Sequence, residues 1–459
     1  MSYFSDHIIL KNIPDPEHDH PQKPVMLTDE TIEIRKQKVL AKMRERGLDV
    51  LVIYADMEHG SNFEYLVGFL PRFEEALLIL HSDGSAQLVL GNENLKKSVH
   101  SRISAEPILC SYFSLPDQPN DSPGELKDIL SRSGLEHHSV GIAGWKKFKS
   151  SHEIYEIPAY ILEAIQDLCG AENICNATDI FIGENGVRLA NTPNEIAHYE
   201  FASSLAGDCM LDAMNLLKPG VTEMEVGDAL DRFGQHNSIV TISAFGKRFI
   251  KGNLYPTERE LKIGDAVSLT VGYRGGCSSR SAAAVENKEQ LPAEQRDYYE
   301  RLCAPYFNAV SLWLQNIHTG MCGGEIYSLI ERVLPKEKYH WHLCPGHTTA
   351  EEEWMSSPFY PGSKEILKSG MLLQTDIIPS LPGYYGVSVE STCCLADKPL
   401  REHIASEYPE LFERFLRRRE YIIKTQGIFL SEDILPMCSS MTYMRPYALN
   451  HAACVVKRN

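Results

Sequence analysis

The sequence has few cysteines and no paired-cysteine motif. Twelve Cys are spread over 459 residues, and none forms a C-x-x-C pair. Such a low density is far from that of a disulfide scaffold. We therefore expect reduced thiols, as in a cytoplasmic protein.

Long apolar runs and a basic leader are also missing. The first seven residues include Asp6, whereas a signal peptide begins with basic residues. No stretch approaches the roughly 20 apolar residues of a membrane-spanning helix. We expect a protein that is neither exported nor anchored in a membrane.

Basic residues are fewer than acidic residues. The chain has 45 Lys and Arg against 62 Asp and Glu, a formal net charge of −17. A surface field of this sign repels phosphate backbones and anionic lipids. The composition therefore argues against nucleic acid and membranes as partners.

The chain is long enough for two domains or more. Residues 1–27 contain four Pro without periodicity, which predicts an extended arm able to reach a neighbouring subunit. A helical pattern from Thr28 to about Arg46 and a predicted hairpin over residues 76–90 indicate an α/β domain at 28–186.

A second domain is expected over residues 187–459. Thr192-Pro193-Asn194-Glu195 is a capping box with Pro at the first helical position, so a long helix should begin there. A second capping box begins at Thr222. Strands and helices are mixed after it rather than strictly alternating, which predicts an α+β domain.

Six short segments in this region resemble, in their order and spacing, the family of creatinase, prolidase and aminopeptidase P. They are Thr192–Ile196, Lys218–Glu223, Gly264–Leu269, Pro345–His347, Ser369–Leu373 and Gly386–Glu390. The resemblance implies an α+β fold with a small creatinase-N-like α/β domain, followed by a C-terminal domain of the pita-bread fold. It also implies a homodimer.

The resemblance includes the metal ligands only in part. Metallopeptidase members of that family bind two divalent cations with two Asp, one His and two Glu. The matching positions here are occupied by Thr270, Ser279, His347, Asp376 and Glu390. Neutral hydroxyls are poor ligands for hard cations and do not offset their charge. We therefore expect no bimetallic centre, and no cofactor.

Two further departures concern substrate handling. A His expected seven residues after His347 is Trp354, and the position of creatinase's catalytic His falls on Asn253. Neither the metallopeptidase mechanism nor that of creatinase therefore carries over to this chain unchanged.

We expect a creatinase-like, metal-independent hydrolase of a carbon–nitrogen bond in a small amino-acid derivative. Three residues form the expected catalytic group: His347 as proton shuttle, with Asp376 and Glu390 holding water or the leaving nitrogen. The candidate substrate-binding residues are Asn253, Thr270, Ser279, Arg280 and Trp354.

Several alternatives stay open. The catalytic group could keep one metal ion in an Xaa-Pro peptidase-like enzyme, it could serve a lyase, or the chain could be an inactive binding module. The Glu351-Glu352-Glu353 run is interpreted as a solvated face, and His340 and His342 as structural.

Overall fold

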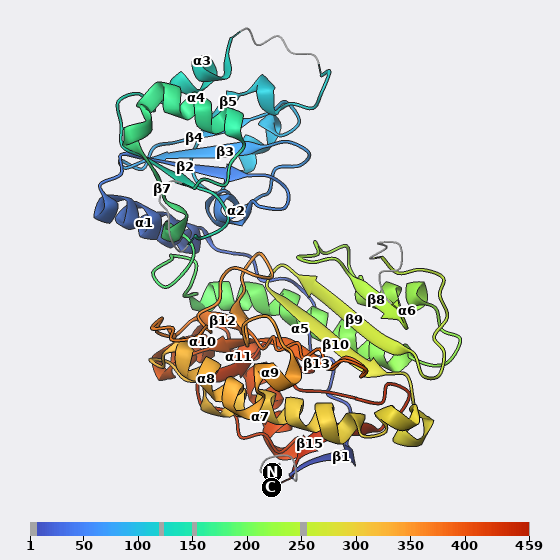
Figure 1. Cartoon of the computed structure of the whole chain (residues 1–459). Helices are drawn as coiled ribbons and strands as arrows, with labels where there is room; N and C mark the ends of the chain where they lie inside the picture. Colours follow the sequence, from blue (N-terminus) through green and yellow to red (C-terminus); the bar gives the residue numbers. More distant parts are fainter. Residues whose placement is uncertain (1–6, 119–123, 149–153, 248–254, 459) are drawn as a thin grey trace. The chain divides into compact units, whose positions relative to one another are not determined.

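A computed structural model describes residues 7–118, 124–148, 154–247 and 255–458 (Figure 1). The described chain divides into two compact units. One consists of residues 27–189, and the other combines residues 7–26 with residues 190–458. The N-terminal segment therefore packs with the C-terminal unit rather than with the unit that follows it in sequence.

The unit of residues 27–189 has a six-stranded mixed sheet in the order β5-β4-β3-β2-β6-β7. The strands are β2 (Val50–Ala55), β3 (Ala76–His81), β4 (Ala86–Leu90), β5 (Glu106–Leu109), β6 (Val140–Ala143) and β7 (Ile174–Asn176). The helices are α1 (Asp29–Arg46), α2 (Ser61–Val67), α3 (Leu126–Ser131) and α4 (Ala159–Cys169).

The predicted elements of this unit are confirmed. The hydroxyl of Thr28 accepts a hydrogen bond from the backbone N–H of Thr31, and α1 ends at Gly47 with φ of 64°. β3 and β4 pair antiparallel as the predicted hairpin. β2 is buried along its whole length, as its run of apolar residues indicates.

The C-terminal unit has a seven-stranded sheet in the order β11-β12-β13-β10-β9-β8, with β14 on β13, and a separate ribbon of β1 and β15. Its strands are β1 (Ile8–Asn12), β8 (Ile242–Phe245), β9 (Ala266–Tyr273), β10 (Gly276–Ala283), β11 (His347–Thr348), β12 (Met371–Gln374), β13 (Ser388–Leu395), β14 (Ile434–Pro436) and β15 (Ala453–Lys457). Its helices are α5 (Pro193–Leu216), α6 (Glu223–Leu230), α7 (Ala304–Asn316), α8 (Gly323–Val333), α9 (Lys336–Tyr339), α10 (Lys398–Glu407) and α11 (Pro409–Glu420).

Helix α5 covers one face of this sheet (Figure 1). It begins at the predicted capping box, in which Thr192 and Glu195 exchange both hydrogen bonds. Successive side chains of a strand point to opposite faces. Val267, Leu269 and Val271 of β9 join the apolar core under α5, so the residues between them point to the other face.

The N-terminal arm is held by ion pairs on its own chain. Arg418 of α11 donates to both carboxylate oxygens of Asp19 at 2.7 Å and to Glu200 of α5 at 2.6 Å. His20 Nδ1 lies 2.8 Å from Asp208 Oδ2, also on α5. The arm, predicted to be able to reach a neighbour, here joins two helices of one chain.

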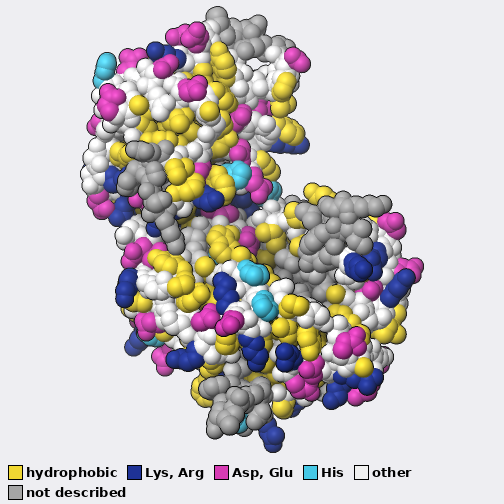
Figure 2. All heavy atoms as spheres, in the orientation of Figure 1, with side chains coloured by type: hydrophobic (Ala, Val, Ile, Leu, Met, Phe, Trp, Pro, Cys, Tyr) yellow, Lys and Arg dark blue, Asp and Glu magenta, His cyan; other side chains and the backbone are white. Residues whose placement is uncertain are grey.

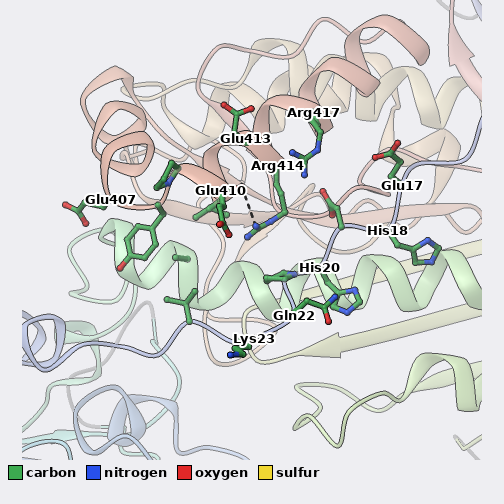
Figure 3. Close-up of a pocket in the computed structure, with 17 residues that line it drawn as sticks. Glu17, His18, His20, Gln22, Lys23, Glu407, Glu410, Glu413, Arg414 and Arg417 are labelled. Atoms are coloured by element: carbon green, nitrogen blue, oxygen red, sulfur yellow. Dashed lines mark hydrogen bonds between the residues drawn. The ribbon is translucent and has the colours of Figure 1, made fainter.

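A groove of about 1060 Å³ runs beside the arm (Figure 3). His18 and His20 reach it from the arm, and Arg414 and Arg417 reach it from α11. None of the residues that line it belongs to the predicted site, so the catalytic group lies elsewhere.

The surface agrees with the composition. Acidic and basic side chains are interspersed on the face that Figure 2 shows. In the described part of the chain, no helix combines the length and apolarity needed to cross a membrane.

Candidate functional site

The site forms on the sheet face that α5 leaves uncovered. Ser279 on β10 pairs with Thr270 on β9 and with Glu390 on β13. Directly opposite residues of antiparallel strands share a face. Thr270, Ser279 and Glu390 therefore form one row, and the Thr270 and Ser279 hydroxyls lie 3.0 Å apart.

A second row runs beside the first. His347 on β11 pairs with Gln374 on β12, which pairs with Thr392 on β13. The amide of Cys277 on β10 donates to Thr392 Oγ1 at 3.3 Å. Cys277 stands two residues before Ser279 on the same strand, so its thiol points to the same face.

Gln374 links the two rows. Its Nε2 donates to Glu390 Oε1 at 3.3 Å and to the Cys277 carbonyl at 3.0 Å, and its Oε1 accepts from the Thr392 hydroxyl. Asp376 follows two residues after Gln374. The sheet register therefore brings the predicted catalytic residues together.

The imidazole of His347 is surrounded by carboxylates. Its Nε2 lies 3.9 Å from Asp376 Oδ2, 3.9 Å from Glu390 Oε1 and 3.2 Å from Glu353 Oε1. The His347 side chain is 0% exposed. Trp354 stacks on one face of the ring, with centroids 4.1 Å apart and planes at 21°.

Two buried polar atoms of this group have no hydrogen-bond partner among the described residues: Nε2 of His347 and Oδ1 of Asp376. Glu353 Oε1 is close to Nε2, but the geometry is that of an ion pair rather than a hydrogen bond. A buried polar atom without a hydrogen-bond partner lowers the stability of the fold, and such atoms indicate places where a ligand can bind.

The electrostatics follow from three carboxylates around one imidazole. Burial disfavours the imidazolium, but Glu353, Glu390 and Asp376 outweigh burial and raise the pKa of His347 to about 10. His347 therefore carries a proton at neutral pH.

The pKa values of both carboxyls of the predicted group are raised. Burial is the main cause for Asp376, and the charge of Glu390 adds to it. Burial is also the main cause for Glu390, against the opposing effect of His347. A buried group with more carboxylates than cations takes up protons or a cation.

Arg280 does not belong to the pocket, and its predicted role as a substrate contact is wrong. It follows Ser279 on β10, so its side chain points to the opposite face, and it is 4% exposed. Among the described residues, its guanidinium donates to the carbonyls of Tyr443, Ser279, Glu390 and Ser440 and to the hydroxyl of Ser391.

The substitution Arg280→Met should lower stability by at least about 3 kcal/mol, because each buried carbonyl left without its donor costs about 1–3 kcal/mol. Denaturant unfolding measures this loss. The exposed Arg296 provides the matched control, Arg296→Met, whose unfolding midpoint should stay unchanged. An unchanged midpoint for Arg280→Met, together with a higher KM, would restore the substrate role.

The sequence predicted that the acidic run 351–353 forms a solvated face, and this prediction is wrong. Glu351 is buried and accepts a hydrogen bond from the Tyr199 hydroxyl at 2.6 Å. The chain turns after β11, with the Ala350 amide bonded to the Glu352 carbonyl, and returns Glu353 to His347. Such a turn depends on tertiary context, so the sequence gives no signal for it.

The remaining predicted positions divide into two groups. Trp354 stacks on His347 and is 39% exposed, so it lies between the buried catalytic group and the surface. Asn253 lies outside the described residues, and its predicted role stays a prediction.

Comparison with known proteins identifies the C-terminal unit. Residues 197–397 match the family model described as metallopeptidase family M24. This part of the chain is therefore similar to the proteins of metallopeptidase family M24. An uncharacterized peptidase of Bacillus subtilis, YqhT, is 26% identical over 224 residues. The match covers 46% of this chain and 61% of that protein's length.

The solved structures of M24-like proteins share the fold. An Xaa-Pro dipeptidase from Bacillus anthracis has a TM-score of 0.60 at 17% identity, covering 80% of this chain and 96% of that one. A prolidase from Thermococcus sibiricus has a TM-score of 0.61 at 20% identity, covering 80% and 95%. The predicted α+β fold, with a small domain before the pita-bread domain, is confirmed.

The family name implies bound metal ions. The question is therefore whether the side chains at the five ligand positions can bind them. The Thr270 and Ser279 hydroxyls bond to each other and offer no negative charge to a second ion. His347, Asp376 and Glu390 place one donor atom each within 4.8 Å of the others. With Nε2 and Oδ1 lacking partners among the described residues, this group fits one divalent cation, not two.

Proposed function

We propose that this M24-like protein hydrolyses a carbon–nitrogen bond in a small amino-acid derivative, without the pair of metal ions of the metallopeptidases that it resembles. One observation carries the proposal. A fully buried imidazole faces three carboxylates, and two polar atoms of this group, His347 Nε2 and Asp376 Oδ1, lack hydrogen-bond partners in the described structure. Such a group can hold water and move protons.

The charges suggest the division of roles. Glu390 is placed to take a proton from water as the oxygen of that water attacks the carbon of the scissile bond. His347, protonated at neutral pH, then gives its proton to the departing nitrogen. The proton held by Glu390 can then return to His347, 3.9 Å away, either directly or through Asp376, whose carboxyl pKa is also raised, and both groups are restored.

Substrate binding falls to the residues around this group. Trp354 offers a half-exposed aromatic surface beside His347. Thr270 and Ser279 present hydroxyls in the same row as Glu390, where they can bond a polar substrate group. These side chains therefore suit a small substrate with one apolar and one polar side.

One cation is better supported than none. The sequence alone favours a metal-independent reaction, but Glu353 adds a third carboxylate that the sequence did not reveal. His347, Asp376 and Glu390 would hold the ion, with the imidazole in its deprotonated form, and His347 would then no longer serve as the proton donor. Once bound, it would act as a Lewis acid on a carbonyl or on water.

Xaa-Pro dipeptides form the second substrate class. Several solved structures of the same fold are named as Xaa-Pro dipeptidases or prolidases, which favours peptides of this kind. The bond broken is again a carbon–nitrogen bond, so both classes use the same chemistry.

A substrate screen tests the proposal. N-substituted amino acids and Xaa-Pro dipeptides are incubated with the purified protein, and the released amine is measured with and without added divalent metal. We expect turnover of one class. An inactive binding module would show no turnover and no stabilisation by any of these compounds, although a ligand at 100 times its Kd adds about 2.7 kcal/mol.

A further inference from the structure

We propose that Glu351 and Tyr199 are positioning residues for the catalytic group. Their hydrogen bond ties the turn after β11 to helix α5, and this tie holds Glu353 and Trp354 against the imidazole of His347. The inference rests on the proposed function, because it concerns what keeps the catalytic imidazole in its arrangement. It adds two residues that touch neither the substrate nor the reacting atoms.

The placement of Glu353 depends on more than its own side chain. Its carboxylate lies 3.2 Å from Nε2 of His347, although the side chain is 22% exposed. The described residues offer this carboxylate no hydrogen bond, and its one ion-pair partner among them is His347. A partly exposed carboxylate with a single partner gains little from one fixed conformation. The backbone of the turn therefore has to keep Glu353 in place.

The turn after β11 is closed at its base by backbone hydrogen bonds. The amide of Thr348 donates to the Ser356 carbonyl at 2.7 Å, and the amide of Met355 donates to the Thr348 carbonyl at 2.9 Å. Inside the turn, the hydroxyl of Thr349 donates to the Glu352 carbonyl at 2.9 Å. These bonds all lie within residues 348–356, so none of them attaches the turn to a helix.

Glu351 supplies the attachment to α5. It is buried, and its Oε1 accepts a hydrogen bond from the Tyr199 hydroxyl at 2.6 Å. The backbone of Tyr199 packs against Gly275 in the connection between β9 and β10, where a Cβ atom would lie 2.7 Å from the Tyr199 carbonyl oxygen. Helix and sheet thus fix the hydroxyl, and a hydrogen bond to a carboxylate is short and strong.

The charge of Glu351 is balanced at the same place. Arg274 precedes Gly275 in the connection between β9 and β10. Burial lowers the pKa of the Arg274 guanidinium, and the charges of Glu351 and Glu352 oppose this effect. A buried carboxylate that has both a donor and a nearby cation is held in its position. Glu351 therefore anchors the turn, while Glu353, two residues later, reaches the catalytic group.

A displaced turn would disturb two neighbours of the imidazole at once. Trp354 follows Glu353 directly, and its ring stacks on His347 with centroids 4.1 Å apart. One shift of this backbone therefore moves a carboxylate and an aromatic ring away from His347. A misplacement of about 1 Å in a catalytic group can cost roughly 100-fold in rate.

The substitution Tyr199→Phe tests the attachment with the smallest change, because it removes only the hydroxyl. We expect kcat on the best substrate to fall roughly 10–100-fold. KM should change much less, because Thr270 and Ser279 lie on β9 and β10 rather than on the turn. Initial rates at equal folded concentration measure both constants.

Variants of Glu351 separate the hydrogen bond from folding. Glu351→Leu should lower kcat as Tyr199→Phe does, and the double variant should be no slower than either single variant, since both act through one bond. Glu351→Gln keeps an acceptor oxygen and should retain most of the natural kcat. The matched control is Tyr443→Phe, which removes a hydroxyl that donates to Asp15 at 2.6 Å beside the N-terminal arm. Its kcat should be unchanged.

The fluorescence of Trp354 gives a readout that needs no substrate. The chain has four Trp, and comparison with Trp354→Phe identifies the emission of this one. Its ring is 39% exposed while it stacks on His347. Release of the turn in Tyr199→Phe should expose the ring further and increase its quenching by acrylamide. Tyr443→Phe should leave the quenching as it is in the natural protein.

The outcomes distinguish this inference from the hydrolase proposal. A natural kcat in Tyr199→Phe would overturn the inference, whether or not the quenching of Trp354 changes. An equal loss of activity in Glu351→Gln and Glu351→Leu would also overturn it, because the acceptor oxygen would then not matter. No turnover by the natural protein, with increased Trp354 quenching in Tyr199→Phe, would contradict the hydrolase and support the attachment of the turn.

Discussion

Replacing His347 by Ala should lower kcat/KM on the best substrate by about 10²–10⁴-fold, the usual contribution of a general acid or base. The reason is the position of the imidazole: it is the one basic group that the structure places in contact with Glu353, Asp376 and Glu390 among the described residues. Without it, the departing nitrogen has no cationic proton donor. Initial rates at saturating and limiting substrate measure the effect.

Folding has to be controlled in this experiment, since removing His347 leaves buried carboxylates without their counter-ion, which costs about 3–5 kcal/mol for a broken buried pair. His347→Gln keeps most of the volume, and its activity is compared at equal folded concentration. His342→Ala, at an exposed position five residues earlier, should be as active as the natural protein. Full activity of folded His347→Gln would remove His347 from the mechanism.

The double substitution Thr270→Asp with Ser279→Asp should create a second metal site. The two positions pair directly across β9 and β10, and their hydroxyls are 3.0 Å apart. Two aspartates at this separation repel each other in the metal-free protein and are neutralised by a divalent cation. The variant should therefore take up one ion more per chain than the natural protein, as elemental analysis measures.

Its stability should depend on metal much more strongly. A cation at 100 times its Kd adds about 2.7 kcal/mol to the free energy of unfolding, and a chelator should remove this gain. The matched control is Thr270→Asn with Ser279→Asn, which has similar side-chain volumes and no added charge. A folded Asp variant that binds no additional ion would show that charge at these two positions does not limit metal binding.

Much of the fold is readable from the sequence because local signals agree with tertiary structure. The capping boxes at Thr192 and Thr222 begin α5 and α6, and Thr28 and Gly47 delimit α1. Such signals arise from backbone groups within one turn of the helix, so they need no distant partner. The β1–β15 ribbon joins the two ends of the chain, and nothing local indicates it.

The candidate site was predictable only where the family pattern marks it. His347, Asp376 and Glu390 come from a motif, and the register of four strands brings them together. No motif indicates Glu353 or Cys277. Glu353 reaches the site through the turn after β11, and Cys277 faces it because it lies two residues before Ser279 on the same strand.

Arg280 is the opposite case, because the sequence predicted it as a site residue and the structure places it outside the site. Its neighbour Ser279 faces the pocket, and a sequence position alone does not tell which face a side chain takes. The structure places it under the sheet, where it binds carbonyl oxygens of the protein.

The central claim is that this pocket does not hold the pair of metal ions, because hydroxyls stand at positions 270 and 279. Elemental analysis of the natural protein, purified without chelator and then equilibrated with Zn²⁺ or Mn²⁺, tests it most directly. We predict no more than one tightly bound ion per chain. Two ions per chain, both lost on substitution of Glu390, would contradict the account.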